Sequence, residues 1–380
     1  MDLSPTDQRR LDALYHNFTD DRDTCLGYPV NAAFDYSSLF RFLSYPINNV
    51  GDPFVPSNYH LNTHEFEREV MQAFAEMTHA PAKGWWGYVT NGGTEGNMYG
   101  IFLARELHPE GVVYYSEDTH YSVNKILRCL HMRNIMIRSE ADGRICLDDL
   151  RETLRIHRDV PPILFANIGT TMQGAVDDLP GIRQILKDLA IHNAYIHADA
   201  ALSGMILPFV ERPQPWDFRA GVDSIAVSGH KMIGSPIPCG VVLARKSHVD
   251  RIARHVEYVG TLDTTISGSR NGFTPLILWY ALRNVGAAGL RQMVRGCLEN
   301  AEYAVERLSE AGKHPMRHEN SITVVFERPS RRLIEKWQIA AHHEQAHIIT
   351  MPQVTRERID RLVADLAEDQ AELDRDREDV

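Results

Sequence analysis

The alternation of apolar and helix-like segments between residues 86 and 245 constrains the fold most strongly. Short apolar runs, separated by segments such as 181–193, lie at 112–116, 162–168, 194–201 and 224–229. Buried parallel strands joined by crossover helices produce this rhythm. The chain is therefore predicted to have an α/β fold with a mostly parallel sheet. Ligands of such sheets bind where the strands end, so residues that follow each run are candidate site residues.

The rest of the chain divides into segments of different character. Residues 1–50 carry scattered aromatics and are interpreted as an arm that packs on a larger body. Residues 51–311 form the predicted large domain, which ends in a long helical stretch over 274–311. Residues 312–370 combine strand-like and helical patterns, which indicates a smaller α+β domain. The last residues, 371–380, are highly charged and are predicted to be disordered.

Charge and cysteine content exclude several classes of function. The formal net charge of −11 repels nucleic acids and anionic membranes at long range, so neither is an expected partner. None of the five cysteines lies in a C-x-x-C pair, which argues against a disulfide framework or a structural zinc site. Residues 1–10 lack a signal-peptide pattern, and no apolar run has membrane-spanning length. We therefore expect a cytoplasmic protein with reduced thiols.

Lys231 is the residue with the strongest chemical implication. It follows the apolar run 224–229 in the sequence Ser228-Gly229-His230-Lys231. Burying an ammonium is costly, but desolvation lowers the pKa of a lysine and leaves a neutral, nucleophilic amine that forms imines. The preceding serine and histidine are suited to holding a phosphate group. Taken alone, the segment is explained more simply as a surface lysine in a turn. Choosing between this explanation and an imine-forming lysine requires evidence from other residues.

Asp199 is the second candidate and ends an apolar run in the sequence AYIHADAALSG. A carboxylate at such a place pairs with a protonated pyridine nitrogen. That pairing makes a pyridoxal 5′-phosphate (PLP) ring an electron sink for a carbanion next to an imine. The small residues Ala200 and Ala201 leave room for a flat ring against the backbone. The alternative is an aspartate that caps a helix or closes a turn.

The segment 88–106 supplies a candidate anion site. An apolar run leads into the sequence NGGTEGN at 91–97 and then into a helical pattern. Glycines let the backbone approach an anion closely, and a helix N-terminus offers free N–H groups. Neither a P-loop nor a G-x-G-x-x-G motif is present. A tight turn between a strand and a helix is the alternative.

Two further strand ends complete the pattern. His120 follows the run 112–116 and is placed to stack on a cofactor ring or to reach a substrate carboxylate. Thr170 and Thr171 follow the run 162–168, where their hydroxyls are placed to meet the 3′-oxygen of PLP. A capping histidine and a turn with β-favouring residues are the ordinary alternatives. Together, the five segments predict a PLP enzyme in which the lysine carries the cofactor.

Four segments resemble the group II PLP-dependent amino-acid decarboxylases, and most of all the bacterial PLP-dependent histidine decarboxylases. They are TNGGTEGN (90–97), HADAALSG (197–204), SGHKMIGSPIPCG (228–240) and HVEYVGTLDTTISGSRNG (255–272). The resemblance extends over roughly residues 30–365. It implies a fold-type-I PLP enzyme with a mostly parallel seven-stranded sheet, a small C-terminal domain and a homodimer with shared active sites. Plant serine decarboxylases look much alike, so serine is the alternative substrate to histidine.

The matched motifs imply roles for individual residues. Lys231 carries the cofactor, and Asp199 binds its pyridine nitrogen. His120 stacks on the ring and lies near the substrate carboxylate, while Thr171 contacts the 3′-oxygen. The implied phosphate ligands are Gly93, Thr94, Ser228 and His230.

Other implied roles depend less directly on the motifs. The segment from Ser267 to Ser269 would reach the active site of the partner subunit, and the arm over 1–50 would embrace that subunit. Tyr258 is a candidate for returning a proton to Cα, with His120 or Lys231 as alternatives. Candidates for the side-chain pocket are Tyr59 and His60.

Competing functions make different demands on the sequence. An aminotransferase needs an arginine to clamp the retained carboxylate, and Arg270 is one candidate. A metal-binding protein would use His342, His343 and His347, which have helical i, i+4 spacing, although a solvated face is the better interpretation. A catalytically inactive relative would have lost the lysine or the aspartate, and both are present. Decarboxylation of an L-amino acid, with L-histidine giving histamine and CO₂, is therefore the predicted reaction, without a metal.

Overall fold

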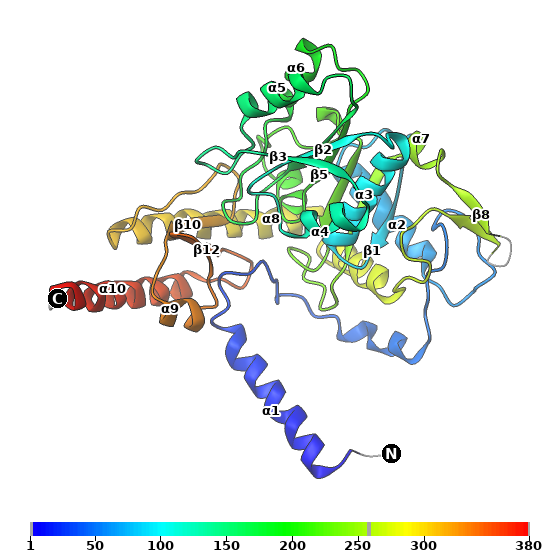
Figure 1. Cartoon of the computed structure of the whole chain (residues 1–380). Coiled ribbons are helices and arrows are strands. Elements are labelled where there is room, and N and C mark those ends of the chain that lie inside the picture. The colour runs from blue at the N-terminus through cyan, green and yellow to red at the C-terminus, as the bar shows by residue number, and fades with distance from the viewer. Residues whose placement is uncertain (1–2, 257–259, 379–380) are drawn as a thin grey trace. The chain divides into compact units, whose positions relative to one another are not determined.

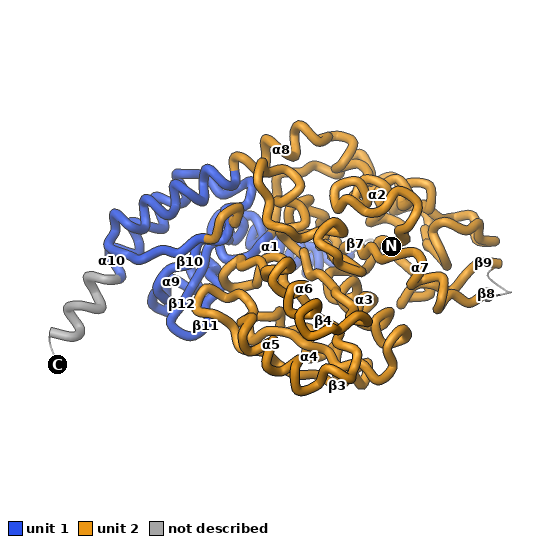
Figure 2. The backbone as a smooth tube through the Cα atoms, turned by 90° about the horizontal axis from the view of Figure 1, so that it is seen from above, with its two compact units in different colours: residues 1–29, 297–317, 322–380 blue, residues 30–296, 318–321 orange. Residues whose placement is uncertain are grey.

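The computed structural model describes residues 3–256 and 260–378, and the chain forms two compact units (Figures 1 and 2). The large unit comprises residues 30–296 and 318–321. The small unit comprises residues 1–29, 297–317 and 322–380. The segment 1–50, predicted as a single arm, is thus divided between the two units.

The large unit is built on a seven-stranded sheet (Figure 1). Its strands, in spatial order, are β1 (Trp85–Thr90), β7 (Gly240–Arg245), β6 (Ser224–Ser228), β5 (Tyr195–Asp199), β4 (Pro162–Asn167), β2 (Val112–Ser116) and β3 (Arg133–Ile137). Only β7 runs antiparallel to its neighbours, and the other pairs are parallel. The predicted α/β fold with a mostly parallel seven-stranded sheet is confirmed.

The apolar runs of the sequence correspond to strands that are covered on both faces. Every residue of β2, β4, β5 and β6 is buried. The helices of the large unit are α2 (His64–Met77), α3 (Gly93–Leu107), α4 (Ser122–Cys129), α5 (Leu147–Ile156), α6 (Leu179–Asp188) and α7 (Lys246–Val249). Helix α3 packs against β5, β6 and β7, where Tyr99, Ile101 and Leu103 join the core. This helix therefore covers the strands that end in the candidate site residues.

Shorter elements complete the large unit. They are the 3-10 turns Ser37–Ser44, Ser203–Met205, Leu207–Phe209 and Phe218–Ala220, and a ribbon of β8 (Arg254–Val256) and β9 (Thr261–Asp263). The helical stretch predicted over 274–311 is α8 (Phe273–Glu310), which begins in the large unit and ends in the small one. Gly286 interrupts α8 with φ 64° and ψ 173°, a conformation that glycine adopts at low cost.

The small unit contains a three-stranded antiparallel sheet of β10 (Thr323–Glu327), β12 (Gln345–Ile349) and β11 (Ala340–His342). Its helices are α1 (Pro5–Arg22), α9 (Arg331–Lys336) and α10 (Arg356–Glu378), together with the end of α8. The backbone N–H of Leu26 donates to Trp337 O, and the backbone N–H of Ile349 on β12 donates to Leu26 O. These two hydrogen bonds attach the segment after α1 to this sheet.

Two sequence expectations about the small unit differ from the structure. The histidines with i, i+4 spacing lie in a β-hairpin, because His342 ends β11 and His347 lies on β12. Helix α10 continues to Glu378, through most of the segment 371–380 that is predicted to be disordered. Alanine, leucine, glutamate and arginine in that segment have high helix propensity, which charge content alone does not reveal.

Candidate active site

The candidate site residues gather at one edge of the sheet. Strands β1, β2, β4, β5 and β6 all end at this edge, because β1 and β6 run parallel on either side of the antiparallel β7. Lys231 follows the end of β6, Asp199 ends β5, and His120 follows β2. Helix α3 begins at Gly93, directly after β1. This is where open α/β sheets bind ligands.

Lys231, Asp199 and His120 are close enough to influence one another electrostatically. Burial lowers the pKa of the Lys231 ammonium, and the Asp199 carboxylate partly opposes this effect. Burial also lowers the pKa of His120, with Asp199 acting to raise it and Lys231 to lower it. An amine with a lowered pKa is a better nucleophile at neutral pH, as imine formation requires.

Asp199 is held by neutral hydrogen-bond donors. Its Oδ1 accepts a bond of 3.1 Å from the backbone N–H of Ala201, and its Oδ2 accepts one of 2.7 Å from Asn97 Nδ2. The side chain of Asn97 is buried within α3. The sequence analysis includes Asn97 only as the end of a glycine-rich segment and misses this role. Its position one turn into the helix that follows the glycines is the sequence feature that could have indicated this role.

The start of α3 forms a cradle with the end of β6. A Cβ atom on Gly93 would lie 2.6 Å from Ser228 Oγ, so only glycine leaves space between the helix and this hydroxyl. The first turn of a helix has N–H groups without helical partners, and Thr94 is exposed in that turn. His230 Nδ1 lies 2.8 Å from Cys239 O, so Nδ1–H donates to this carbonyl, and Nε2 can donate to a phosphate only when the ring is protonated. The N–H groups of this helix turn and the hydroxyls of Thr94 and Ser228 are donors of the kind that bind a phosphate group.

The remaining strand-end residues differ in their surroundings. His120 Nδ1 accepts from the backbone N–H of Ser122 at 3.3 Å and lies 2.8 Å from its Oγ. Thr170 is buried, and its Oγ1 accepts from the Ala175 N–H at 3.0 Å, so it stabilises the turn. Thr171 is exposed beside it. Of the two threonines, only Thr171 offers its hydroxyl to a ligand.

Other predicted site residues are not joined to this group by hydrogen bonds. Tyr59 donates to Pro46 O at 2.8 Å, His60 is exposed, and Ser269 Oγ accepts from Asn48 Nδ2 at 3.0 Å. In the residues that the structure describes, no hydrogen bond links these three side chains to Lys231. Tyr258 lies outside the described residues.

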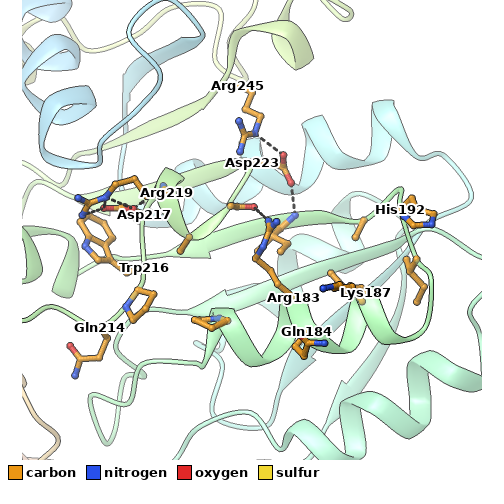
Figure 3. Close-up of a pocket in the computed structure, with 18 of the residues that line it drawn as sticks. Arg183, Gln184, Lys187, His192, Gln214, Trp216, Asp217, Arg219, Asp223 and Arg245 are labelled. Atoms are coloured by element: carbon orange, nitrogen blue, oxygen red, sulfur yellow. Dashed lines mark hydrogen bonds and ion pairs between the residues drawn. The ribbon is translucent and has the colours of Figure 1, made fainter.

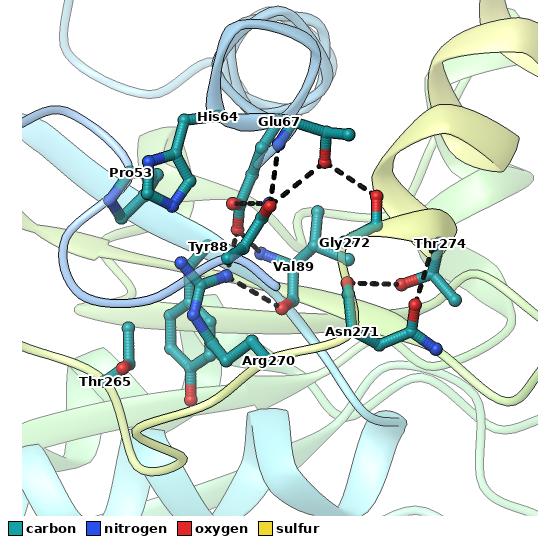
Figure 4. A network of polar contacts seen from close by, with 12 residues as sticks. Pro53, His64, Glu67, Tyr88, Val89, Thr265, Arg270, Asn271, Gly272 and Thr274 are labelled. Carbon is teal, nitrogen blue, oxygen red and sulfur yellow. Dashed lines mark hydrogen bonds and ion pairs between the residues drawn. The ribbon is translucent and has the colours of Figure 1, made fainter. Parts of the chain in front are cut away.

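Arg270 is not a free carboxylate clamp, because its guanidinium is held in a network of polar contacts (Figure 4). It is 3% exposed and forms a buried ion pair with Glu67 of α2, and its Nη2 donates to Gly51 O at 2.9 Å. Its guanidinium also lies 5.3 Å from the centre of the Tyr88 ring. The interpretation of Arg270 as an aminotransferase clamp is therefore wrong, because its charge is already used within the fold.

A cavity of about 1080 Å³ lies at the opposite end of the strands (Figure 3). Ile196 near the start of β5 and Asp223 just before β6 line it. Asp223 is paired with Arg245 at 3.0 Å. This cavity is thus separate from the strand ends that carry Lys231. In residues 3–256 and 260–378, no cluster of three metal-ligating side chains occurs.

The arrangement at the sheet edge fits PLP. The cradle left by Gly93 accommodates a phosphate, the carboxylate of Asp199 suits a protonated ring nitrogen, and Lys231 offers an amine whose pKa is lowered by burial. Fold and site together define a PLP-dependent enzyme of fold type I. The family model described as pyridoxal-dependent decarboxylase conserved domain matches residues 47–328. The chain belongs to this family of decarboxylases, and its cofactor is PLP.

Individual relatives match over nearly the whole chain. The histidine decarboxylase of Pseudomonas entomophila (strain L48) is 52% identical over 93% of this chain and 88% of that protein. The histidine decarboxylase of Morganella morganii is 48% identical over 97% of this chain and 98% of that protein. A solved structure of L-methionine decarboxylase from Streptomyces sp. 590 superposes with a TM-score of 0.87 at 27% identity, covering 97% of this chain and 96% of that one. No helix among the described residues combines the length and apolarity needed to cross a membrane.

Proposed function

We propose that the protein decarboxylates L-histidine to histamine and CO₂ with PLP as cofactor. The observation that carries this proposal is the grouping of Lys231, Asp199 and His120 at the carboxyl edge of the sheet. The choice of histidine is supported by the histidine decarboxylases that are about half identical to this chain. The burial of Arg270 disfavours transamination, since no carboxylate clamp is available from that residue.

The proposed chemistry assigns separate tasks to the lysine and the aspartate. When bound, PLP supplies a conjugated ring that takes up the electron pair left as the bond between Cα and the carboxylate breaks. Lys231 would hold the cofactor covalently through its amine, which the amine of the substrate would replace. Asp199 keeps a proton on the pyridine nitrogen, because a carboxylate held by neutral donors favours a cation beside it.

Other residues of the edge hold and orient the reactants. His120 would lie against the ring and beside the substrate carboxylate, Thr171 would contact the 3′-oxygen, and Ala201 would leave room for the ring. The phosphate is held by Gly93, Thr94, Ser228 and His230. After CO₂ has left, Tyr258 returns a proton to Cα, with His120 or Lys231 as the alternative donor. The proposed side-chain pocket includes Tyr59 and His60.

We further propose a homodimer with shared active sites. All the residues of α1 are exposed, and Leu11, Leu14, Tyr15 and Phe18 have the i, i+3, i+4, i+7 spacing of one apolar face. Such a face is covered by a partner in a stable assembly. In the proposed dimer, Ser269 reaches the site of the partner subunit. Sedimentation velocity should give a dimer for the full chain and a weaker dimer for the double variant Leu14→Asp, Phe18→Asp; a monomeric full chain would contradict the proposal.

A cytoplasmic location is proposed from the state of the thiols. All five cysteines are free, as is usual in a reducing compartment. Fractionation of the producing cell, with activity followed in each fraction, tests this location. Recovery of the activity from an oxidising compartment would contradict it.

The deciding experiment is amine release by the PLP-loaded protein from a panel of L-amino acids that includes histidine, serine, aspartate and the aromatic amino acids. Histamine from histidine alone is the expected result. Ethanolamine from serine would keep the mechanism and change the assigned side-chain pocket. Turnover that depends on a keto acid and releases no amine would overturn decarboxylation in favour of transamination.

A further inference from the structure

One face of strand β5 carries a row of polar side chains behind Asp199. Tyr195, His197 and Asp199 are two residues apart, so their side chains point to the same face of the sheet. Helix α3 packs against β5 and supplies Asn97. All four side chains are at least nine-tenths buried. Buried polar groups in such a number require mutual hydrogen bonds.

These side chains form one continuous chain of hydrogen bonds, completed by Ser224 of β6. Tyr195 O–H donates to Ser224 Oγ at 2.9 Å, and Ser224 Oγ lies 2.7 Å from His197 Nδ1. His197 Nε2 lies 3.0 Å from Asn97 Oδ1, and Asn97 Nδ2 donates to Asp199 Oδ2 at 2.7 Å. The chain therefore connects the far end of the strand to the carboxylate.

The charge of Asp199 fixes the direction of every bond in this chain. An ionised carboxylate only accepts, so Asn97 must turn its Nδ2 toward Asp199 and its Oδ1 toward His197. That oxygen requires a proton on Nε2 of the histidine, which leaves Nδ1 as an acceptor for Ser224. A histidine with its proton on Nδ1 would instead favour a reversed Asn97 amide, whose oxygen would face the carboxylate and repel it. The tautomer of His197 and the charge of Asp199 are thus linked.

The position and the neutrality of the imidazole are imposed by packing. Gly100 of α3 lies so close to the ring that a Cβ atom there would overlap it. On the neighbouring strand β4, Phe165 lies 5.2 Å from the imidazole between ring centres. Complete burial lowers the pKa of His197 to about 3, so the ring carries one proton at neutral pH. A neutral ring with one defined tautomer is what the bond directions require.

We propose that His197 is a positioning residue that acts through Asn97 to hold Asp199 ionised and correctly oriented. The inference rests on the role proposed above for Asp199 toward the pyridine nitrogen of PLP. Its consequence is that the protonation of that nitrogen depends on the tautomer of a histidine that does not touch the cofactor. Aligned hydrogen bonds also strengthen one another in a buried site.

The test compares three substitutions at His197 in the PLP-loaded full chain. A glutamine amide reaches the position of Nε2 and keeps a donor toward Asn97, whereas an asparagine amide reaches only the position of Nδ1. Leucine fills space without any donor. The nitrogen-15 NMR shift of PLP labelled at the ring nitrogen reports the protonation of that nitrogen, and kcat and KM are measured separately.

We expect His197→Asn and His197→Leu to lose the protonated-nitrogen signal and to lower kcat by on the order of 10- to 100-fold, with little change in KM. His197→Gln should restore the signal and most of kcat. A protonated nitrogen and unchanged kcat in the asparagine and leucine variants would overturn the proposal. His347→Asn is the matched control, because His347 is also buried but lies in the small unit.

Two further variants keep the result unambiguous. If the His197 variants do not fold, Ser224→Ala removes the hydroxyl that donates to His197 Nδ1 and so weakens the preference for the required tautomer. It should shift the nitrogen signal in the same direction by a smaller amount; no shift would overturn the proposal. Asp199→Asn tests the underlying assignment. If it leaves the ring nitrogen protonated, the role proposed for Asp199 fails. If it removes the proton while the His197 variants do not, only the present inference fails.

Discussion

Two buried carboxylates of the large unit, Glu67 and Asp199, are held in opposite ways. Glu67 forms an ion pair with Arg270, and the side chains of both are at most 1% exposed. Asp199 receives its hydrogen bonds from an amide side chain and a backbone N–H, both neutral. In the part of the chain that the structure describes, no ion pair to Asp199 is formed.

The difference separates a structural charge from a functional one. The charge of Glu67 is neutralised inside the fold, where the pair joins α2, strand β1 through Val89, and the segment that precedes α8 (Figure 4). The charge of Asp199 is oriented but not neutralised, so it can stabilise a cation that arrives with a ligand. Glu67 already has a buried cation as its partner and joins parts of the fold, whereas Asp199 lies at the sheet edge with only neutral donors and can pair with a cation of a ligand.

The largest loss of activity is expected for substitution of Lys231, which Asp199 influences electrostatically. Lys231→Ala should abolish the visible absorption band of bound PLP and lower kcat by on the order of 10⁴-fold or more, because the covalent attachment and the amine are both lost. Absorption spectroscopy and amine release measure the two effects. Lys246→Ala, an exposed lysine paired with Asp250, is the control and should change neither. Retention of both band and turnover by Lys231→Ala would show that another residue carries the cofactor.

Substitution of the functional carboxylate should damage rate more than stability. Asp199→Ala should still bind PLP weakly while kcat falls by on the order of 10²- to 10⁴-fold, because the ring nitrogen loses the group that keeps it protonated. Titration with PLP and steady-state kinetics separate binding from rate. Near-normal turnover would contradict the assigned role.

Substitution of the structural carboxylate should have the reverse effect. Glu67→Gln should lower the free energy of unfolding by about 3–5 kcal/mol, because Arg270 is left as an uncompensated buried charge. Adding Arg270→Met should recover much of this loss, since an apolar side chain replaces the unpaired charge. Chemical denaturation of the PLP-loaded protein measures both. Glu335→Gln, in an exposed pair with Arg331, should change little, and an equally large loss there would argue against burial as the cause.

The last effect concerns acid stability, and it is the smallest of these effects when it is measured over a single pH unit. Burial lowers the pKa of His197 from 6.5 to about 3. Between these two pH values the unfolded chain therefore binds a proton at this residue that the folded chain does not bind. Stability should therefore be full above pH 6.5 and fall toward pH 3, by at most about 1.4 kcal/mol per pH unit from this residue. The difference between wild type and His197→Gln in denaturation at several pH values isolates this contribution. Equal slopes in the two proteins would contradict a buried neutral imidazole.

The sequence predicts the sheet, and it selects two candidate site residues, because both are encoded locally. Each buried parallel strand is a short apolar run, and Lys231 and Asp199 directly follow or end such runs. The direction of parallel strands then brings their carboxyl ends to one edge, whatever the details of packing. In the sequence, Tyr195, His197 and Asp199 alternate with apolar residues, and this alternation indicates a polar row on one face of β5.

Only the tertiary structure decides which side chains are partners. Asn97 and Asp199 are 102 residues apart, and Glu67 and Arg270 are 203 apart, so no local pattern joins them. For the same reason, the sequence alone left Arg270 as a candidate substrate clamp, whereas in the fold it forms an ion pair with Glu67. Hydrogen bonds and ion pairs form over about 3 Å, and such distances between remote residues are set by packing. The sequence by itself therefore determined where chemistry is expected, and the packing of α2 and α3 on the sheet decided which charge is left available for it.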